Sequence, residues 1–306
     1  MLSNISRVYS EVKNTFNEAS SVLGYDLWKL VQEGPAIELN KSWKTQPALL
    51  ASSVSIWRIW KSIGGKIPKF MAGHSHGEYS ALVCSDSLDF LTAIELVEFR
   101  GKIMQSAVPK GLGSMSVIIG LDYKIVQNIC DSIKNDKKIV ELANFNTKNQ
   151  IVISGHTCAV KDVEISCMQA GATKVLRLPI SVPSHCVLMK SAAKEFKKKL
   201  KNIIILTPKI PIINNVDVRI EQDSDMIKKA LVRQIYNPVR WKDIMQYFLK
   251  NNIYTLLEMG PGKVLTKFIQ CHNMYNVFTG IAINNYASLM YARNNKIIGE
   301  KSDFSK

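Results

Sequence analysis

Residues 69–90 read KFMAGHSHGEYSALVCSDSLDF, and this stretch decides the predicted fold. A short apolar run at 70–72 is followed by G-H-S-H-G and then by a segment with helical apolar spacing. Gly73 and Gly77 flank Ser75, and glycine permits the sharp backbone turn that a strand–turn–helix needs. Such a turn lifts the Ser75 hydroxyl above the sheet edge and directs the next backbone N–H groups toward its target. The spacing therefore predicts that Ser75 is a nucleophile.

The composition is that of a folded globular protein. The 306 residues are 46% hydrophobic and 21% charged, and they contain no apolar run of the length, about 18 residues, that a membrane span requires. Residues 1–10 lack the apolar core of an export signal, so we expect a cytoplasmic protein that does not bind membranes. The six cysteines show no metal-binding spacing, which is typical of free thiols in a reducing compartment.

The formal net charge is +15, from 40 basic and 25 acidic residues. Apart from a lysine run at 194–201, the basic residues are scattered, and they are not interleaved with aromatic residues that could stack on bases. This pattern argues against nucleic-acid binding. A compositional drift toward Lys, Asn and Ile accounts for the largest share of the charge, and an acidic protein partner is the second explanation.

The order of predicted elements indicates a small domain inserted into a larger one. Between 109 and 180 the predicted elements are strand 114–119, helix 124–133, strand 139–144, strand 150–154, helix 159–170 and strand 173–179. This β-α-β-β-α-β order predicts a ferredoxin-like domain at 109–180. In the rest of the chain, 1–108 and 181–306, helices alternate with apolar strands at 70–72, 211–218, 255–258 and 277–282. That alternation predicts a larger, hydrolase-like α/β domain, with a parallel sheet and helices on both faces.

Several motifs occur together in one order and spacing. They are GHSHGEYSAL, VEFRGKIMQ, the β-α-β-β-α-β insert, SVPSHC, INNVDV, LVRQIYNPVRW and MGPGKVL. On these motifs, from about residue 3 to about residue 270, the sequence resembles the malonyl-CoA:acyl carrier protein transacylases of bacterial fatty-acid synthesis. Taken jointly, the motifs are very specific.

The resemblance implies an acyl transfer in two steps. Ser75 takes malonyl from malonyl-CoA as an oxygen ester, and the phosphopantetheine thiol of an acidic acyl carrier protein then removes it. His185 is the implied general base, oriented by the backbone carbonyl of Gln234 rather than by a carboxylate. Arg100 is the implied partner of the malonyl carboxylate, because a guanidinium fork matches a carboxylate with two hydrogen bonds. Read without the resemblance, Arg100 could equally be an ordinary surface charge.

The resemblance also implies an oxyanion site, a cleft lining and the absence of a bound cofactor. The backbone N–H of His76 is the implied oxyanion donor, while Gln46, Asn144 and Asn146 are expected to line the same cleft. No metal or permanently bound cofactor is implied, since CoA and phosphopantetheine enter as parts of the substrates. His76 stands where the family usually has Leu, and its imidazole is expected to crowd the pocket.

The N-terminal region departs from the family pattern. The family begins with an apolar strand that leads into a G-Q-G-S-Q loop, whose glutamine helps to bind the oxyanion. Met1 falls just after that loop, so we expect both the strand and the loop to be missing. Because a central strand buries several apolar side chains, a protein built from this sequence alone is expected to fold poorly.

Three other functions stay open at this point. A serine esterase or thioesterase shares the G-x-S-x-G and the histidine, but Arg100 and the lack of an evident acidic residue between Ser75 and His185 disfavour it. An inactive, truncated protein that still binds carrier protein is the second. A metal site at His74 and His76 is the third, and it is disfavoured because no carboxylate or cysteine cluster accompanies them.

Overall fold

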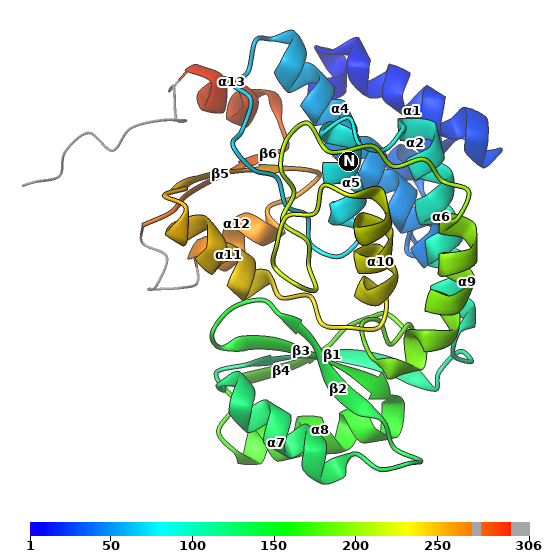
Figure 1. Cartoon of the computed structure of the whole chain (residues 1–306), viewed down its shortest axis with the longest axis vertical. Coiled ribbons are helices and arrows are strands. Elements are labelled where there is room, and N and C mark those ends of the chain that lie inside the picture. Colours follow the sequence, from blue (N-terminus) through cyan, green and yellow to red (C-terminus); the bar gives the residue numbers. More distant parts are fainter. Residues whose placement is uncertain (271–276, 295–306) are drawn as a thin grey trace, which may run out of the picture.

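The first third of the protein is helical. The structure is a computed structural model that describes residues 1–270 and 277–294 (Figure 1). The helices up to residue 106 are η1 (Ile5–Arg7), α1 (Ser10–Leu23), α2 (Leu27–Glu33), α3 (Ala36–Leu39), α4 (Ser42–Ser62), α5 (Gly77–Cys84) and α6 (Phe90–Ser106).

Helix α4 lies at the centre of the larger core. Buried side chains occur on all its faces between Gln46 and Trp60, as expected of a helix enclosed by other elements, and α1 and α6 pack against it. The helix starts at Ser42, so Pro47 lies inside it. This buried helix forms one wall behind the Ser75 turn, because Gln46 projects from it toward the site described below.

The inserted segment forms its own four-stranded sheet. Its elements are β1 (Gly113–Ile119), α7 (Tyr123–Ile133), β2 (Val140–Phe145), β3 (Gln150–His156), α8 (Thr157–Gln169) and β4 (Lys174–Arg177). The strand order is β2-β3-β1-β4, every neighbouring pair is antiparallel, and side chains of α7 and α8 join the sheet in a separate core. The predicted ferredoxin-like fold is confirmed, while the domain boundaries at 108/109 and 180/181 stay a prediction.

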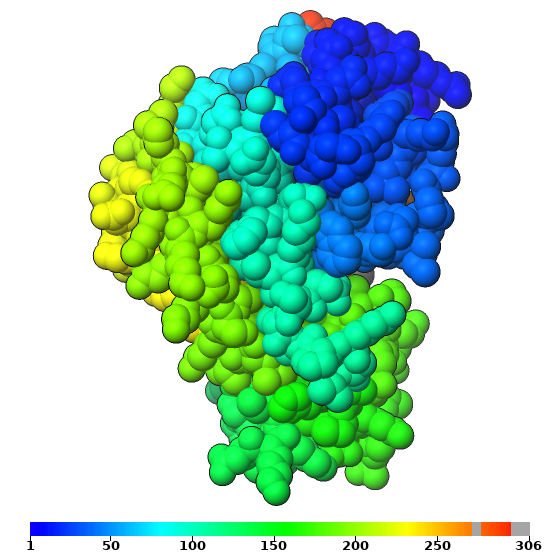
Figure 2. Space-filling view, turned by 90° about the vertical axis from the view of Figure 1, so that its right-hand side faces the viewer, coloured from blue at the N-terminus to red at the C-terminus, as the bar shows by residue number. Residues whose placement is uncertain are grey.

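The rest of the chain returns to the larger part. Its elements are η2 (Val187–Met189), α9 (Lys190–Leu200), α10 (Ser224–Gln234), α11 (Trp241–Lys250), β5 (Thr255–Met259), α12 (Val264–Gln270), β6 (Thr279–Ile283) and α13 (Tyr286–Asn294). Helices α6 and α9 pack side by side and reach down to the small sheet, as Figure 2 shows. Within 1–270 and 277–294, none of the helices combines the length and the apolar character needed to cross a bilayer.

Parallel pairing in the larger part follows the predicted alternation, but two strands are shorter than predicted. β5 and β6 pair in parallel over their full five residues. The strands predicted at 70–72 and 211–218 are reduced to one parallel bridge between Met71 and Ile212. Pairing stops there because one segment turns at Gly73 and the other folds back, so that Ile213 bridges to Ile220 in antiparallel fashion. The α/β class is nevertheless confirmed.

A backbone bridge ties the small sheet to the larger part. Phe145 N donates to Val239 O at 2.9 Å, and Val239 N donates to Ala143 O at 2.9 Å. The end of β2 therefore lies against the segment that leads into α11. This contact, together with the return of the chain at 178–186, brings β2 and the segment carrying His185 toward the Ser75 turn.

Candidate active site

Ser75 occupies a strained turn at the start of α5. Its φ is +52°, in the left-handed region that residues other than glycine seldom adopt. At Gly73 a Cβ atom would lie 2.0 Å from the backbone of Gly77, so this position needs glycine. A Cβ at Gly77 would meet nothing within 4 Å, so only the first of the two predicted glycine positions is sterically required.

Ser75 and His185 form a hydrogen-bonded pair. Ser75 Oγ lies 2.8 Å from His185 Nε2, and His185 Nδ1 lies 2.7 Å from the backbone oxygen of Gln234. A carbonyl oxygen only accepts, so Nδ1 carries the ring hydrogen and Nε2 is left to accept the proton of the Ser75 hydroxyl. The structure thus brings together the three predicted residues, with the backbone of Gln234 in the orienting position.

Burial keeps the His185 imidazole neutral. The side chain is 2% exposed, and burial, reinforced by the positive charge of Arg100, lowers the pKa of His185 from 6.5 to about 3. A neutral imidazole is the form that can accept a proton from serine at neutral pH.

Arg100 is a buried cation beside the nucleophile. It projects from α6, is 2% exposed, and its Nη2 atom lies 3.3 Å from Ser75 Oγ. Arg100 Nη1 donates to Gln46 Oε1 at 2.8 Å and Nη2 donates to Gln234 Oε1 at 3.0 Å. A buried guanidinium is costly unless such hydrogen bonds are made, so the surface-charge alternative is wrong.

Comparison with known proteins identifies the family of this Ser–His–Arg arrangement. The acyl transferase domain model matches residues 3–273. The malonyl CoA-acyl carrier protein transacylase of Salmonella typhimurium is 49% identical over 292 residues, which cover 95% of this chain and 94% of that protein. The chain belongs to the malonyl CoA-acyl carrier protein transacylase family.

Solved structures agree with this assignment. A malonyl-transacylase in complex with its type II PKS acyl-carrier protein matches with a TM-score of 0.94 and 50% identity, over 96% of this chain and 94% of that one. The acyl carrier protein S-malonyltransferase of Vibrio cholerae matches with a TM-score of 0.92 and 49% identity, over 95% of this chain and 94% of that one. The resemblance on sequence motifs is confirmed, this chain is an acyltransferase of the transacylase family, and the esterase alternative is not favoured.

Gln46 contacts the guanidinium of Arg100, and its place in the lining of the substrate cleft stays a prediction. It is 6% exposed, and its Nε2 atom donates to Ser42 Oγ at 2.8 Å while its oxygen accepts from Arg100. The first two turns of α4 therefore fix the position of the Arg100 Nη1 atom, through Gln46.

Asn144 and Asn146 are placed differently from Gln46. Asn146 Oδ1 lies 2.9 Å from His74 Nε2, and Asn144 bridges to Val239 through its backbone. Among the hydrogen bonds of the described residues, neither asparagine reaches Ser75, His185 or Arg100. Asn144 lies in β2 and Asn146 directly follows it, and their place in the lining of the cleft stays a prediction.

His76 is the N-cap residue of α5, directly after the nucleophile, and its backbone N–H as oxyanion donor stays a prediction. Burial, together with the charge of Arg100, lowers the pKa of its imidazole to about 3, so the ring is neutral.

Among residues 1–270 and 277–294, no three His, Cys, Asp or Glu side chains are grouped so that they could hold a metal ion, so nothing supports a site at His74 and His76. Cys84, Cys130, Cys158, Cys167 and Cys186 are free thiols as predicted, and the predicted free thiol Cys271 and the histidine His272 lie outside the described residues.

Two residues of the site were not predicted from the sequence. Asn215 is fully buried, its Oδ1 accepts from Ser75 N at 2.7 Å, and its Nδ2 donates to Gly73 O at 2.7 Å. Glu78 is 3% exposed and accepts from the backbone N–H of Asn215 at 3.0 Å. Both belong to motifs quoted above, INNVDV and GHSHGEYSAL. The position of Glu78 only three residues after Ser75, inside the same motif, was the available signal.

Proposed function

We propose that this chain transfers a malonyl group from malonyl-CoA to the phosphopantetheine thiol of acyl carrier protein through a malonyl ester on Ser75, and so supplies fatty-acid synthesis. The observation that carries the proposal is the buried Arg100 guanidinium 3.3 Å from the oxygen of a histidine-paired serine. A cation at that position suits an acyl group that ends in a carboxylate. The names of the curated relatives and the carrier-protein complex support both substrates.

The first half-reaction makes the malonyl ester. His185 Nε2 takes the proton of the Ser75 hydroxyl as Oγ attacks the thioester carbonyl, and the backbone N–H of His76 at the start of α5 stabilises the oxyanion. The intermediate collapses with cleavage of the C–S bond, and the CoA sulfur leaves with the proton from His185. Arg100 holds the malonyl carboxylate, which fixes the carbonyl over Ser75.

The second half-reaction reverses these roles with a different thiol. His185 removes the proton of the phosphopantetheine thiol, the sulfur attacks the ester carbonyl, and the C–O bond to Ser75 breaks as His185 returns the proton to Oγ. The energies of a thioester and its product thioester are similar, so no bound cofactor is required. We place this reaction in the cytoplasm.

The function is tested by following the acyl group. After incubation with malonyl-CoA, intact-protein mass spectrometry should show one malonyl adduct, which holo acyl carrier protein then removes with the appearance of malonyl carrier protein. Ser75→Ala should remain unmodified and folded. An adduct on Ser75→Ala would remove Ser75 from the mechanism, and release of free malonate at the rate of adduct loss would favour the esterase. Carrier-protein binding without any adduct would favour the inactive remnant.

A further inference from the structure

Glu78 is a buried carboxylate that the transfer reaction does not use directly. It lies in the first turn of α5, where the positive end of the helix dipole favours a negative charge. Its Oε2 atom accepts two hydrogen bonds, from Asn215 N at 3.0 Å and from Gln234 Nε2 at 2.8 Å. The carboxylate therefore contacts the residue whose backbone orients His185.

The Gln234 amide connects Glu78 to the residues around the nucleophile. Its nitrogen donates to Glu78 and to Ser75 O, the latter at 3.0 Å, and its oxygen accepts from Arg100 Nη2 at 3.0 Å. The backbone carbonyl of Ser75 can only accept and a guanidinium can only donate. The orientation of the amide is therefore fixed, with the oxygen toward Arg100, and Glu78 restrains the end of the amide that faces away from Arg100.

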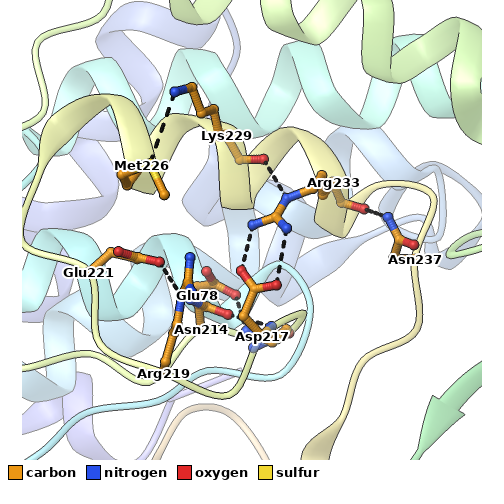
Figure 3. Close-up of polar contacts among 10 residues, drawn as sticks. Glu78, Asn214, Asp217, Arg219, Glu221, Met226, Lys229, Arg233 and Asn237 are labelled. Carbon is orange, nitrogen blue, oxygen red and sulfur yellow. Dashed lines mark hydrogen bonds and ion pairs between the residues drawn. The ribbon is translucent and has the colours of Figure 1, made fainter.

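The backbone of Gln234 is held independently of Glu78, through the contacts of the neighbouring residue Arg233. Figure 3 shows Arg233, next to Gln234 in α10, forked onto the carboxylate of Asp217, with distances of 3.0 and 2.5 Å. Asp217 N in turn donates to Asn214 Oδ1 at 2.8 Å, beside Glu78 in the same view. The end of α10 thus stays in place through Arg233, which leaves the Gln234 side chain as the part that depends on Glu78.

We propose that Glu78 is a positioning residue for the choice of acyl group. Its side chain is long enough to accept a hydrogen bond from Gln234 Nε2, and this bond holds the Gln234 amide in place. The amide oxygen in turn holds Arg100 where the carboxylate of the incoming acyl group binds. The inference rests on the proposed malonyl transfer and deepens it. It assigns the selectivity to a chain of contacts that runs from Glu78 through Gln234 to Arg100.

The protonation of Glu78 agrees with a role that depends on reach. Burial raises the pKa of the Glu78 carboxyl to about 7, against the opposing effect of the hydrogen bond from Gln234. A carboxyl oxygen accepts a hydrogen bond from an amide whether or not the group is ionised.

Two substitutions separate the effect of the side-chain length of Glu78 from the effect of its negative charge. Glu78→Gln keeps the length and an acceptor oxygen, whereas Glu78→Asp keeps the charge but withdraws the acceptor from Gln234. The measurement is the rate of Ser75 acylation by malonyl-CoA and by acetyl-CoA, each as a function of concentration, with folding checked by circular dichroism and thermal melting. We expect Glu78→Asp to raise the half-saturating concentration of malonyl-CoA. We also expect it to lower the malonyl-to-acetyl ratio of kcat/KM about 10-fold, as for loss of one hydrogen bond to a charged group. Glu78→Gln should keep the ratio within about 3-fold.

Leu27→Ala is the matched control for loss of stability alone. Leu27 lies in α2, away from Glu78, is fully buried and belongs to the apolar core. This variant should melt at a lower temperature and keep the wild-type ratio. If Glu78→Asp does not fold, Glu78→Met replaces it, because Met keeps the length without a comparable acceptor, and the same loss of ratio is expected.

The outcomes distinguish this inference from the proposed function. A wild-type protein that malonyl-CoA does not acylate overturns the proposed function and the inference with it. A wild type that is acylated, beside a folded Glu78→Asp with an unchanged ratio, overturns the inference alone. If Glu78→Asp keeps the malonyl-to-acetyl ratio while Glu78→Gln loses it, the charge of Glu78 matters rather than the length of its side chain. That result would also overturn the inference.

Discussion

We expect the choice of acyl group to depend on Arg100. Its side chain is 2% exposed, and the atoms that accept its hydrogen bonds are the uncharged oxygens of Gln46, Gln234 and Ser75. Those contacts are uncharged, and the buried Glu78 carboxyl, which acts on Arg100 through its charge, is separated from it by the Gln234 amide. A carboxylate that enters the cleft would pair with the guanidinium directly, and at low local dielectric the ion pair is strong when its hydrogen bonds are made.

We therefore expect Arg100→Ala to lose the preference for malonyl. The kcat/KM of Ser75 acylation by malonyl-CoA should fall about 10- to 100-fold, the equivalent of one charged hydrogen bond, while acylation by acetyl-CoA should stay the same or rise. Arg100→Lys is the control, because it keeps the charge but cannot form the fork, and it should fall between the two. A malonyl-to-acetyl ratio that does not change in Arg100→Ala would contradict the assignment.

The partly buried imidazole of His76 predicts a loss of stability in acid. His76 has a native pKa of about 3 and an ordinary pKa of 6.5, so below pH 6.5 the unfolded chain takes up a proton that the native protein excludes. The contribution of His76 to the free energy of unfolding is fully present above pH 6.5 and should fall as the pH is lowered from 6.5 toward 3. Glu78 acts in the opposite direction, because its raised pKa makes the native protein bind a proton more readily.

Comparing wild type with His76→Leu isolates one histidine from these opposing groups. Urea unfolding at pH 7.5 and at pH 5 should show that the wild type loses more stability than His76→Leu does. Equal losses would mean that the imidazole of His76 is hydrated and titrates normally. Leu is also the residue that the family usually has here, so this variant should retain transfer activity.

At the scale of elements, the Ser75 turn is held in shape by Asn215 from the segment before α10. The Asn215 amide satisfies the N–H of Ser75 and the carbonyl of Gly73, two backbone groups that the sharp turn removes from regular pairing. An unsatisfied buried polar group costs about 1–3 kcal/mol. The turn is therefore stabilised by a neighbouring segment as well as by its own glycine.

Asn215→Ala should destabilise the protein by about 2–4 kcal/mol, since it leaves both backbone groups unpaired. The acylation rate should also fall, because Ser75 loses its fixed position. Urea unfolding and single-turnover acylation measure the two effects. Asn251→Ala is a suitable control, because Asn251 is partly buried and bonds only to the end of α11, through Tyr247 O, so its loss should cost less and leave the rate unchanged. Equal losses of stability in the two variants would contradict this role of Asn215.

The elements that the sequence predicts best are those whose pattern is local. The elements of the small domain lie within about two or three residues of their predicted ends, because apolar spacing alone determines them. The strands at 70–72 and 211–218 were overestimated, because a parallel strand exists only where a neighbour pairs with it. Ser75, His185 and Arg100 were found through motifs, whereas the roles of Glu78 and Asn215 depend on contacts 137 or more residues apart in the chain.

At the scale of the whole molecule, the net charge is +15, and part of the positive charge is concentrated at the end of one helix. Lys197, Lys198 and Lys199 lie in the last turn of α9, which packs beside α6 on the face shown in Figure 2. Exposed charges act over about 10 Å at 0.1 M salt, so they influence the approach of a large acidic partner more than that of a small thiol.

We expect the rate of malonyl transfer to acyl carrier protein to fall more steeply with salt than the rate of transfer to pantetheine. Both rates are measured on the same malonylated protein between 0.05 and 0.5 M NaCl, so that the chemistry at Ser75 is common to the two. A steeper slope with carrier protein would assign a role to the positive charge in association. Equal slopes would leave compositional drift as the explanation of the +15.

Gln234 has one further consequence, for how such an enzyme changes over evolutionary time. The orientation of His185 comes from a main-chain oxygen, which every amino acid possesses, whereas the contact with Arg100 comes from the side chain of the same residue. A codon change at position 234 can therefore alter which acyl group is accepted while the hydrogen bond that orients the general base is kept. In a triad built on an aspartate, replacing the orienting residue would remove that hydrogen bond altogether. Substrate range and catalytic competence can thus be inherited separately, although they meet at a single residue.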